Sequence, residues 1–183
     1  MISILIPAHK EPDILRFIDQ IEYEIRPNQI VVCNDRYGKG KGWALREALK
    51  EATGDRFIFI DGDYDILPEE INKVIVYLRQ YDVVVGNKGL PKRLSRKLLT
   101  VLSRLWVRLL FNLCDDTQTG IKGFNYRPEW KTNGWAFDIE ILYQARKLGK
   151  SMIEIPVRAT VSDSKSLRDI WFTLIESLKI RFQ

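Results

Sequence analysis

The chain has 183 residues, 45% of them hydrophobic, and a net charge of +5 at pH 7. These values are typical of one globular domain with a core of ordinary size. His9 is the only histidine, which argues against a histidine-based triad or a multi-histidine zinc site. Cys33 and Cys114 lack metal-ligand spacing, and we interpret them as reduced, buried thiols of a cytosolic protein. We expect no secretory signal, because no basic region precedes the short apolar run at residues 2–8.

Apolar runs alternate with segments of helical periodicity along the first half of the chain. The runs predict strands at residues 2–8, 29–34, 57–61 and 82–87, and the periodic segments predict helices at residues 13–25, 43–52 and from Pro68 onward. This alternation predicts an α/β fold with a mostly parallel sheet and helices on both faces. Ligands bind such sheets at the carboxyl ends of the strands.

Three aspartates, Asp61, Asp63 and Asp65, stand at alternate positions where the third predicted strand ends. Carboxylates this close repel one another, so a cation or a solvated turn must compensate for their charge. An EF-hand calcium loop would need Gly and Glu where this chain has Ile66 and Asn72. Hard oxygen ligands suit Mg²⁺ or Mn²⁺, which usually share their sites with substrate phosphates. We therefore favour a metal site over an acidic turn at the start of a helix.

The glycine-rich run GKGKG, from Gly38 to Gly42, precedes the second predicted helix. Glycines at a helix start let backbone N–H groups approach a phosphate, and Lys39 or Lys41 would add positive charge. The run matches neither a P-loop nor the G-x-G-x-x-G pattern. A flexible turn is therefore an equally good interpretation.

Positive charge is concentrated in one segment of the chain. Residues 88–112 contain seven basic residues and no acidic one, whereas the whole chain carries only +5. The seven are Lys88, Lys92, Arg93, Arg96, Lys97, Arg104 and Arg108. Apolar residues recur at helical spacing through about residues 92–112, which predicts an amphipathic helix.

We expect this basic helix to lie on an anionic membrane surface. If it spanned a bilayer, each basic residue near the centre would cost about 2.5–3.5 kcal/mol. A helix with basic residues on one face and Leu, Trp and Phe on the other suits the interface instead. An ordinary helix packed on the core is the second interpretation, and nucleic acid binding is a distant third. A second amphipathic segment, about residues 166–182, either contacts lipid as well or packs on the domain.

Eight segments, including the glycine run and the three aspartates described above, follow one another in a characteristic order. They are PAHKEPD, VVCND, GKGKGWALREAL, FIDGDYD, VVVGNKG, DTQTGIKGF, FDIEILYQARKLG and IEIPVRATVSDSKS. This order resembles glycosyltransferase family 2, and within it the polyprenyl-phosphate sugar transferases of the dolichol-phosphate mannose synthase type. The resemblance covers residues 2 to about 168. It implies one GT-A domain over residues 1–183, with a Rossmann-like, mostly parallel sheet and a metal-binding D-x-D motif.

The resemblance also implies an activity and its substrates. The reaction would be metal-dependent, inverting transfer of a hexose, with mannose as the first choice and glucose as the second. The donor would be GDP-mannose or UDP-glucose, and the acceptor would be a polyprenyl phosphate or another lipid-linked molecule. The cofactor would be Mn²⁺ or Mg²⁺.

By this resemblance the candidate site residues fall into three binding groups. Nucleotide-sugar binding is assigned to Pro7, Ala8, His9, Glu11, Asn34, Asp35, Lys41, Asp61 and Gly62. The metal ligands are Asp61, Asp63 and Asp65, and the residues that bind acceptor or phosphate are Lys122, Ser164 and Lys165. His9 and Lys10 stand where the family usually has Tyr-Asn, which leaves the identity of the base open.

Asp63, Lys88 and Asp138 are the catalytic candidates. A metal ion on Asp63 would stabilise the departing nucleoside diphosphate, and Lys88 stands where the family usually has an arginine facing the phosphates. A lipid phosphate is already an anion and needs no general base. An acceptor hydroxyl does need a base, and Asp138 is then the candidate, with Asp116 behind it. Asp138 fits equally well as an acid at the start of a helix with no catalytic task.

We therefore expect a peripheral, monotopic enzyme on the cytoplasmic face of the cell membrane, with no nucleic acid partner. Two other classes stay open. One is a sugar-phosphate nucleotidyltransferase, which would also use a Rossmann-like domain and paired carboxylates. The other is a non-catalytic basic module that binds membranes or nucleic acid, in which the aspartates only cap a helix.

Overall fold

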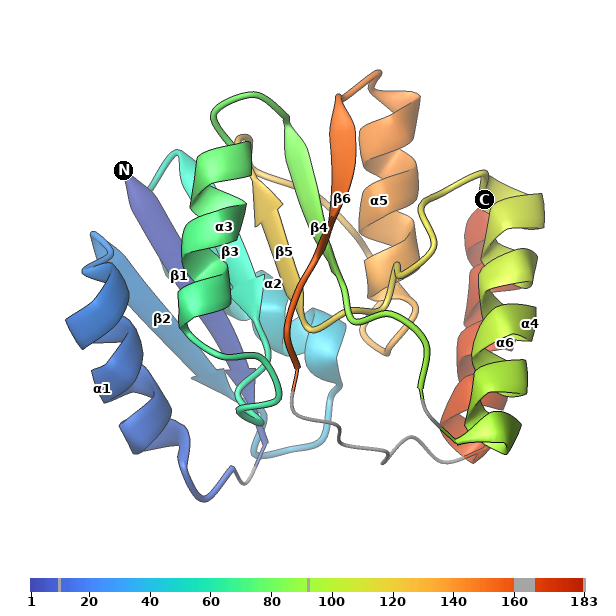
Figure 1. Ribbon diagram of the computed structural model, residues 1–183, viewed down its shortest axis with the longest axis horizontal. Coiled ribbons are helices and arrows are strands. Elements are labelled where there is room, and N and C mark those ends of the chain that lie inside the picture. The colour runs from blue at the N-terminus through green and yellow to red at the C-terminus, as the bar shows by residue number, and fades with distance from the viewer. Residues whose placement is uncertain (10, 92, 160–166, 183) are drawn as a thin grey trace.

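The structure is a computed structural model that describes residues 1–9, 11–91, 93–159 and 167–182 (Figure 1). Strands and helices alternate along the described chain. The strands are β1 (Ile2–Ala8), β2 (Gln29–Asn34), β3 (Arg56–Ile60), β4 (Val83–Asn87), β5 (Ile121–Phe124) and β6 (Met152–Pro156). The helices are α1 (Ile14–Ile25), α2 (Lys41–Glu51), α3 (Glu69–Tyr77), α4 (Leu94–Phe111), α5 (Phe137–Lys147) and α6 (Leu167–Phe182). The predicted strands and helices of the first half are all present, with ends shifted by one or two residues.

The strands form one mixed sheet in the order β2-β1-β3-β5-β4-β6. The pairs β1–β2, β1–β3 and β4–β6 are parallel, whereas β5 runs antiparallel to both β3 and β4. The prediction of a mostly parallel sheet is therefore confirmed. The carboxyl ends of β1, β2, β3 and β4 meet at one edge, the lower edge in Figure 1.

Two hydrophobic clusters hold the helices against the two faces of the sheet. Helices α1 and α3 cover one face, and α2 and α5 cover the other (Figure 1). Successive residues of β3 belong to different hydrophobic clusters, because successive side chains of a strand point to opposite faces of the sheet. Ile58 packs with Phe17 of α1 and Val74 of α3, whereas Phe59 packs with Leu45 of α2 and Ile139 of α5. Burial on both faces explains why these strands are continuous apolar runs.

Apolar patterning did not predict β5, and α5 and β6 were not predicted from it either. Strand β5 has the clearest reason. It has only four residues, and two of them are Lys122 and Gly123. A Cβ atom on Gly123 would lie 2.4 Å from Cγ1 of Val74 and 2.8 Å from Cδ1 of Leu78. Glycine is therefore required where α3 approaches the backbone of β5 most closely.

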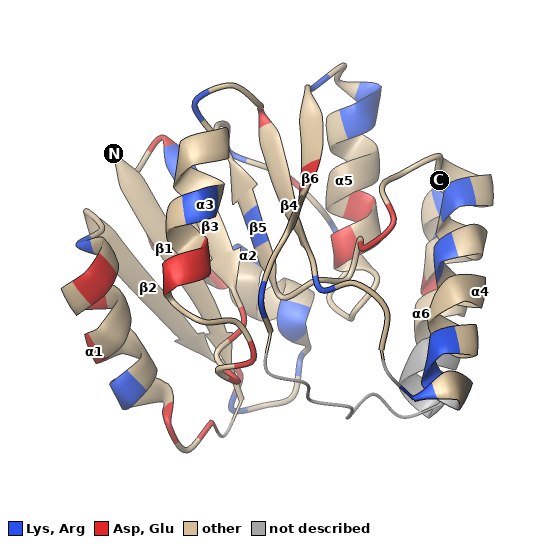
Figure 2. Ribbon diagram, viewed as in Figure 1, with Lys and Arg blue, Asp and Glu red and all other residues tan. Residues whose placement is uncertain are grey.

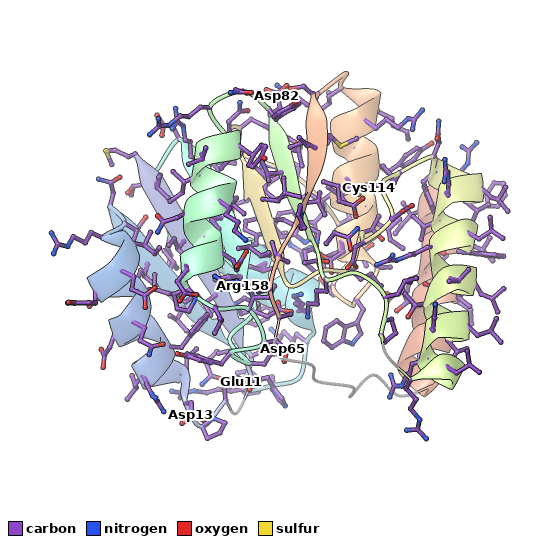
Figure 3. All side chains as sticks on the ribbon, viewed as in Figure 1. Glu11, Asp13, Asp65, Asp82, Cys114 and Arg158 are labelled. Carbon is purple, nitrogen blue, oxygen red and sulfur yellow. The ribbon has the colours of Figure 1, made fainter. Side chains whose placement is uncertain are left out.

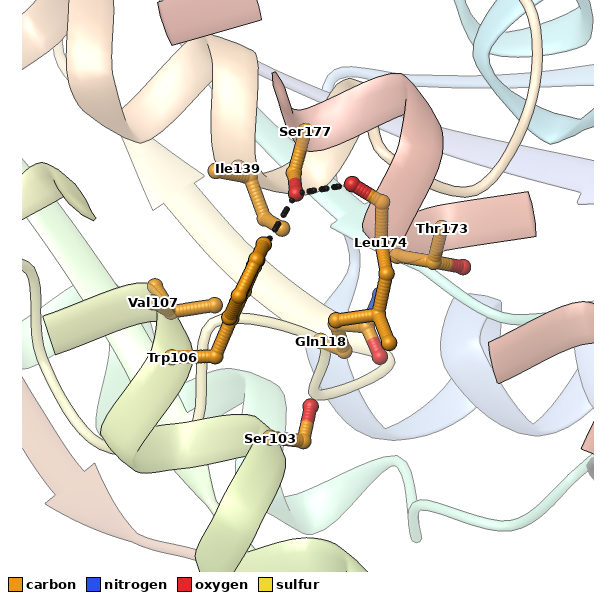
Figure 4. A pocket seen from close by; sticks show the side chains of 8 residues that line it. All are labelled: Ser103, Trp106, Val107, Gln118, Ile139, Thr173, Leu174 and Ser177. Atoms are coloured by element: carbon orange, nitrogen blue, oxygen red, sulfur yellow. Dashed lines mark hydrogen bonds between the residues drawn. The ribbon is translucent and has the colours of Figure 1, made fainter. Parts of the chain in front are cut away.

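Helices α4 and α6 run side by side beyond α5, at the right of Figure 1. Their inner sides join the core through Val107 and Phe111 of α4 and Ile180 of α6. Figure 4 shows Trp106 and Ser177 facing each other, and Nε1 of Trp106 donates a hydrogen bond of 3.0 Å to Oγ of Ser177. A cavity of about 20 Å³ lies beside them, which is room for a single water molecule.

The side of α4 that faces away from the domain carries six exposed apolar residues. They are Leu94, Leu98, Val101, Leu102, Leu105 and Leu109, and they are called the outer face of α4 below. Helix α6 adds Phe172, Ile175, Leu178 and Phe182, which are also exposed. Figure 2 shows basic residues along α4 and no acidic residue in that helix. None of the helices that the structure describes has both the length and the apolar character needed to cross a membrane.

Candidate active site

A pocket of about 280 Å³ opens at the edge where the carboxyl ends of the strands meet. Its lining consists of Pro7, Ala8, His9, Glu11, Asp35, Gly38, Gly40, Lys41, Ala44, Asp61, Gly62, Asp63 and Trp135. Nine of these residues were sequence candidates. The structure brings them together because β1 lies between β2 and β3 in the sheet, and α2 follows β2 in the chain. Figure 3 labels Glu11 and Asp65 near this edge.

Asp35 holds the glycine turn that leads into α2. Its two carboxylate oxygens accept hydrogen bonds from the backbone N–H groups of Lys39 at 2.8 Å and Gly40 at 2.7 Å. The backbone carbonyl of Asp35 lies 2.7 Å from Nδ1 of His9, which links the ends of β1 and β2. This carboxylate therefore shapes the turn, a role that the sequence analysis did not assign to it.

The start of α2 is fixed by two glycines that fit under the loop at residues 130–136. Gly40 has φ +108°, and a Cβ atom there would lie 2.4 Å from the carbonyl oxygen of Asn133. A Cβ atom on Gly42 would lie 2.4 Å from the carbonyl oxygen of Thr132. The N-terminus of α2 lies at the pocket. Its Trp43 N–H donates to the carbonyl oxygen of Asn133 at 3.2 Å, whereas the N–H groups of Lys41 and Gly42 have no acceptor among the described residues. These two N–H groups suit a phosphate.

Lys41, the first residue of α2, forms an ion pair with the first aspartate of the D-x-D motif. Its Nζ lies 2.6 Å from Oδ1 of Asp61 and 3.9 Å from Oδ2 of Asp138. Burial alone would lower the pKa of Lys41, but the charges of Asp61 and Asp138 raise it, so the ammonium stays protonated. Burial likewise opposes ionisation of Asp61, yet Lys41 holds the pKa of that carboxyl below its usual value. The aromatic rings of Trp135 and Phe137 lie 5.7 and 5.5 Å from the same ammonium.

Asp63 and Asp65 have different surroundings. Partial burial and then the charges of Asp61 and Asp65 raise the pKa of Asp63, whose Oδ1 accepts a hydrogen bond from the backbone N–H of Asp65. Asp65 is buried, and its Oδ2 lies 3.2 Å from Nζ of Lys88. Lys88 also donates its backbone N–H to Oδ2 of Asp116. Of the three aspartates, Asp63 is therefore the one whose ionisation is opposed by burial and by the charges of its neighbours.

The carboxylates of the D-x-D motif fit a divalent cation. The described part of the chain holds no group of three or more acids, histidines or cysteines that could enclose a metal ion. Mg²⁺ and similar ions are usually held by one or two carboxylates together with substrate phosphates. Asp61 and Asp63 satisfy that requirement. Burial first, and then the charge of Asp61, raises the pKa of Asp63, and a bound cation would favour its ionised form.

Lys122 and Asp138 form a buried ion pair beneath the pocket. The Nζ of Lys122 lies 2.6 Å from Oδ1 of Asp138 and donates to the carbonyl oxygen of Thr119. Both side chains are only 2% exposed. Lys122 was predicted to bind the acceptor, but the structure buries it with its own partners. Asp138 was the candidate base, and the structure encloses it between Lys122 and Lys41.

This pair predicts a large effect on stability. Replacing Lys122 with Met should lower the free energy of unfolding by about 3–5 kcal/mol, because Asp138 loses its close buried partner. Urea denaturation followed by circular dichroism measures the change. The matched control is Lys50→Met on the exposed pair with Glu47, which should change stability by about 0–1 kcal/mol. Equal effects of the two substitutions would contradict this account.

Four other sequence candidates either do not line the pocket or lie outside the residues that the structure describes. Asn34 is exposed at the end of β2 and does not line the pocket. Ser164 and Lys165 lie outside the described residues. Asp116 pairs with Arg104 at 3.4 Å as well as with the backbone of Lys88, so it supports the loop after β4.

Four pocket residues were not among the candidate site residues: Gly38, Gly40, Ala44 and Trp135. Trp135 is the one that lies outside the segment around the glycine turn. It lies in an irregular loop without periodicity, and only its position just before the segment FDIEIL could have pointed to it. The loop is held over α2 by hydrogen bonds from Arg46 to the carbonyl oxygen of Lys131 and from Trp130 to that of Gly42. Trp135 is 40% exposed, and its ring lies 5.7 Å from the ammonium of Lys41.

Comparison with known proteins assigns the chain to a family. The model of glycosyl transferase family 2 matches residues 16–120, more than half of the chain. The chain belongs to glycosyltransferase family 2. The matched region runs from α1 to the start of β5, and it includes the glycine turn and the D-x-D motif. The recognition made from the eight sequence segments is thereby confirmed.

Several members of this family are similar to the chain over most of its length. It is 30% identical over 132 residues to the glycosyltransferase AglD of Haloferax volcanii, covering 64% of the chain and 21% of that protein. It is 28% identical to the dolichyl-phosphate beta-glucosyltransferase of Drosophila melanogaster, covering 73% and 47%. It is 21% identical to the undecaprenyl-phosphate mannosyltransferase of Micrococcus luteus, covering 84% and 81%. The chain thus spans less than half the length of the first two relatives.

Solved structures establish the fold of this family 2 chain. Glucosyl-3-phosphoglycerate synthase from Mycobacterium tuberculosis in complex with UDP superposes with a TM-score of 0.77 at 16% identity, covering 100% of the chain and 79% of the enzyme. Mannosyl-3-phosphoglycerate synthase from Rubrobacter xylanophilus gives a TM-score of 0.77 at 19% identity, covering 98% and 72%. The predicted GT-A fold is confirmed. The mycobacterial enzyme has also been crystallised with Mn²⁺ and UDP-glucose.

Proposed function

We propose that the chain transfers a hexose from a nucleotide sugar to a polyprenyl phosphate at a membrane surface, with inversion. The observation that carries this proposal is the pocket in which the N-terminus of α2 and Lys41 meet Asp61 and Asp63. Such a site offers backbone N–H groups and a cation to a diphosphate, and carboxylates to a divalent cation. Relatives named for glucose and mannose transfer to polyprenyl phosphates support the choice of substrates.

Binding of the donor follows from the charges in the pocket. Pro7, Ala8, His9 and Glu11 form the wall at the end of β1, where we propose that the nucleoside lies. The diphosphate would then lie against the start of α2. Asp61 and Asp63 would hold Mn²⁺ or Mg²⁺, which supplies charge neutralisation for the departing nucleoside diphosphate when it is bound.

The acceptor side of the reaction needs orientation more than proton transfer. A polyprenyl phosphate is an anion at neutral pH, so its oxygen attacks without a general base. Lys88 is the proposed contact for the incoming phosphate, because its Nζ lies 3.2 Å from Oδ2 of Asp65, two residues beyond the pocket residue Asp63. Asp138 is buried and bonded to Lys122, a setting that supports a positioning role over that of a base. A phosphate acceptor is consistent with such a site.

We propose that α4 and α6 attach the chain to the cytoplasmic face of the cell membrane as a peripheral protein. The outer face of α4 is apolar and points away from the domain. Lys97 and Arg108 are exposed on the same helix, and Arg93 is exposed just before it. Exposed leucines flanked by basic residues suit an anionic lipid surface. The sequence analysis is corrected at two residues, because Trp106 packs on Ser177 and Arg104 binds the carbonyl oxygen of Gly89 and Asp116. Neither side chain is available to lipid.

A ligand screen tests the donor assignment. Nucleotide sugars that bind the folded chain at a hundred times their dissociation constant should raise the melting temperature by about 5–10 °C. Thermal shift with GDP-mannose, UDP-glucose, GDP and UDP, each with and without Mn²⁺, identifies the base and the sugar. GDP-mannose is the first donor to test and UDP-glucose the second. The shift should require Mn²⁺.

The screen extends to the competing classes by adding a nucleoside triphosphate with a sugar phosphate, and by testing binding to vesicles. A shift with nucleoside triphosphate and sugar phosphate, but with no nucleotide sugar, would favour a sugar-phosphate nucleotidyltransferase. No shift with any nucleotide, together with binding to vesicles, would favour a non-catalytic membrane module. Either result would contradict the proposed transfer.

A further inference from the structure

Lys41 has two carboxylates within reach. Its ammonium lies 2.6 Å from Oδ1 of Asp61, which faces the pocket, and 3.9 Å from Oδ2 of Asp138, which lies beneath it. A direct hydrogen bond to Asp138 would need a shift of only about 1 Å. The lysine side chain is flexible enough to make that shift without movement of the helix.

Asp138 presents an oxygen that the described structure leaves unsatisfied. Its Oδ1 is bonded to Lys122 at 2.6 Å, whereas its Oδ2 is buried and has no hydrogen-bond partner in the described part of the chain. A buried, unsatisfied carboxylate oxygen is costly, so it is normally kept only where a partner is available. The ammonium of Lys41 lies 3.9 Å from this oxygen and can serve as its donor.

Asp61 cannot serve a lysine and a divalent cation equally well at the same oxygen. In the present arrangement its Oδ1 is paired with Lys41. A Cβ atom added at Gly120 would lie 2.6 Å from its Oδ2, so the backbone of Gly120 lies close to that oxygen. Two cations that approach one carboxylate oxygen repel each other strongly in a partly buried site. Arrival of a divalent cation at Asp61 therefore displaces the ammonium.

We propose that Lys41 is an internal counter-ion that occupies Asp61 until a divalent cation binds, and that Oδ2 of Asp138 then receives the lysine. This inference rests on the proposed use of Asp61 and Asp63 for the metal. Asp138 becomes a positioning residue that acts through Lys41. The exchange satisfies the buried oxygen of Asp138 in the metal-bound state and keeps Asp61 neutralised in the metal-free state.

Metal binding without any reaction tests the exchange. Titration of Mn²⁺, with free Mn²⁺ measured by electron paramagnetic resonance, gives its dissociation constant for each variant. Lys41→Met removes the competitor and should tighten binding of Mn²⁺ alone by about tenfold, within the usual range for coupling between two sites. Lys39→Met is the matched control, because its ammonium lies over the Trp43 ring and forms no described ion pair with Asp61.

A double-mutant cycle separates the exchange from general electrostatics. Asp138→Asn removes the charge that receives Lys41, so it should weaken Mn²⁺ binding in the wild-type background. In the Lys41→Met background it should have little effect, because no lysine has to be received. Simple loss of a negative charge would instead weaken Mn²⁺ binding equally in both backgrounds, and that result would overturn the inference. If Asp138→Asn does not fold, the comparison of Lys41→Met with Lys39→Met still overturns the exchange when the two variants bind Mn²⁺ with equal affinity.

The same titrations distinguish failure of the inference from failure of the proposed function. Unchanged Mn²⁺ affinity in Lys41→Met, with Mn²⁺ and UDP or GDP still binding together to the wild type, overturns the exchange alone. Absence of Mn²⁺ binding in every variant, with and without nucleotide, overturns both. Tighter binding in Lys41→Met and an Asp138 effect confined to the wild-type background support the exchange.

Discussion

Replacing Asp63 with Ala is expected to reduce sugar transfer by at least about a thousandfold. The reason is that the site offers so few ligands: Asp61 is paired with Lys41, and Asp65 with Lys88. Loss of one carboxylate from so small a set removes the metal ion and its stabilisation of the departing diphosphate. The measurement is the initial rate of transfer from radiolabelled nucleotide sugar to polyprenyl phosphate. Thermal shift with the nucleotide should also become independent of Mn²⁺.

A control variant separates this effect from the general loss of an acid. Asp19→Ala removes an exposed aspartate of α1 that does not line the pocket, and it should leave both rate and Mn²⁺ dependence unchanged. Full activity of Asp63→Ala, or of the wild type in excess chelator, is the result that would remove the metal from the proposal. Circular dichroism confirms that the variants are folded.

Replacing Leu105 and Leu109 together with Ser is expected to lower membrane binding by about a hundredfold. Both side chains belong to the outer face of α4, and they are 50% and 76% exposed. A large apolar side chain that becomes fully buried contributes about 1.5–3 kcal/mol, and less when it inserts only partly. Two such losses therefore correspond to about two orders of magnitude in the partition coefficient. Co-sedimentation with vesicles that contain anionic lipid measures it.

The matched control replaces two leucines that are equally exposed elsewhere. Leu15 of α1 and Leu148 after α5 are 74% and 66% exposed, and their replacement with Ser should not change membrane binding. Binding of the wild type should require anionic lipid and weaken with salt, because the basic residues of α4 act through screened charge. If the wild type stays in the supernatant with anionic vesicles at low salt, the outer face of α4 is not a lipid contact. Trp106 is unsuitable for this test, since its substitution would disturb the packing on α6.

The local sequence determined most of the sheet and the position of the candidate site. Strands buried on both faces need continuous apolar runs, and those runs identified β1, β2, β3 and β4 without tertiary information. Because the carboxyl ends of parallel strands meet at one edge, polar residues such as His9, Asp35 and Asp61 were predicted to share a site. They line one pocket. The helical period of α4 was equally visible, because an amphipathic helix repeats its apolar residues at fixed spacing.

The tertiary structure alone decided which charges meet and which side chains are buried. The sequence predicted that Lys122 binds a ligand. Strand β5, however, is inserted antiparallel between β3 and β4, and this strand order places Lys122 next to Asp138 beneath the pocket. Trp135 reaches the pocket because its loop lies over Gly40 and Gly42 at the start of α2. Trp106 turns inward because α6 packs beside α4. Each of these contacts joins residues far apart in the chain, and local periodicity carries no information about such pairs because it records only which face of an element is apolar.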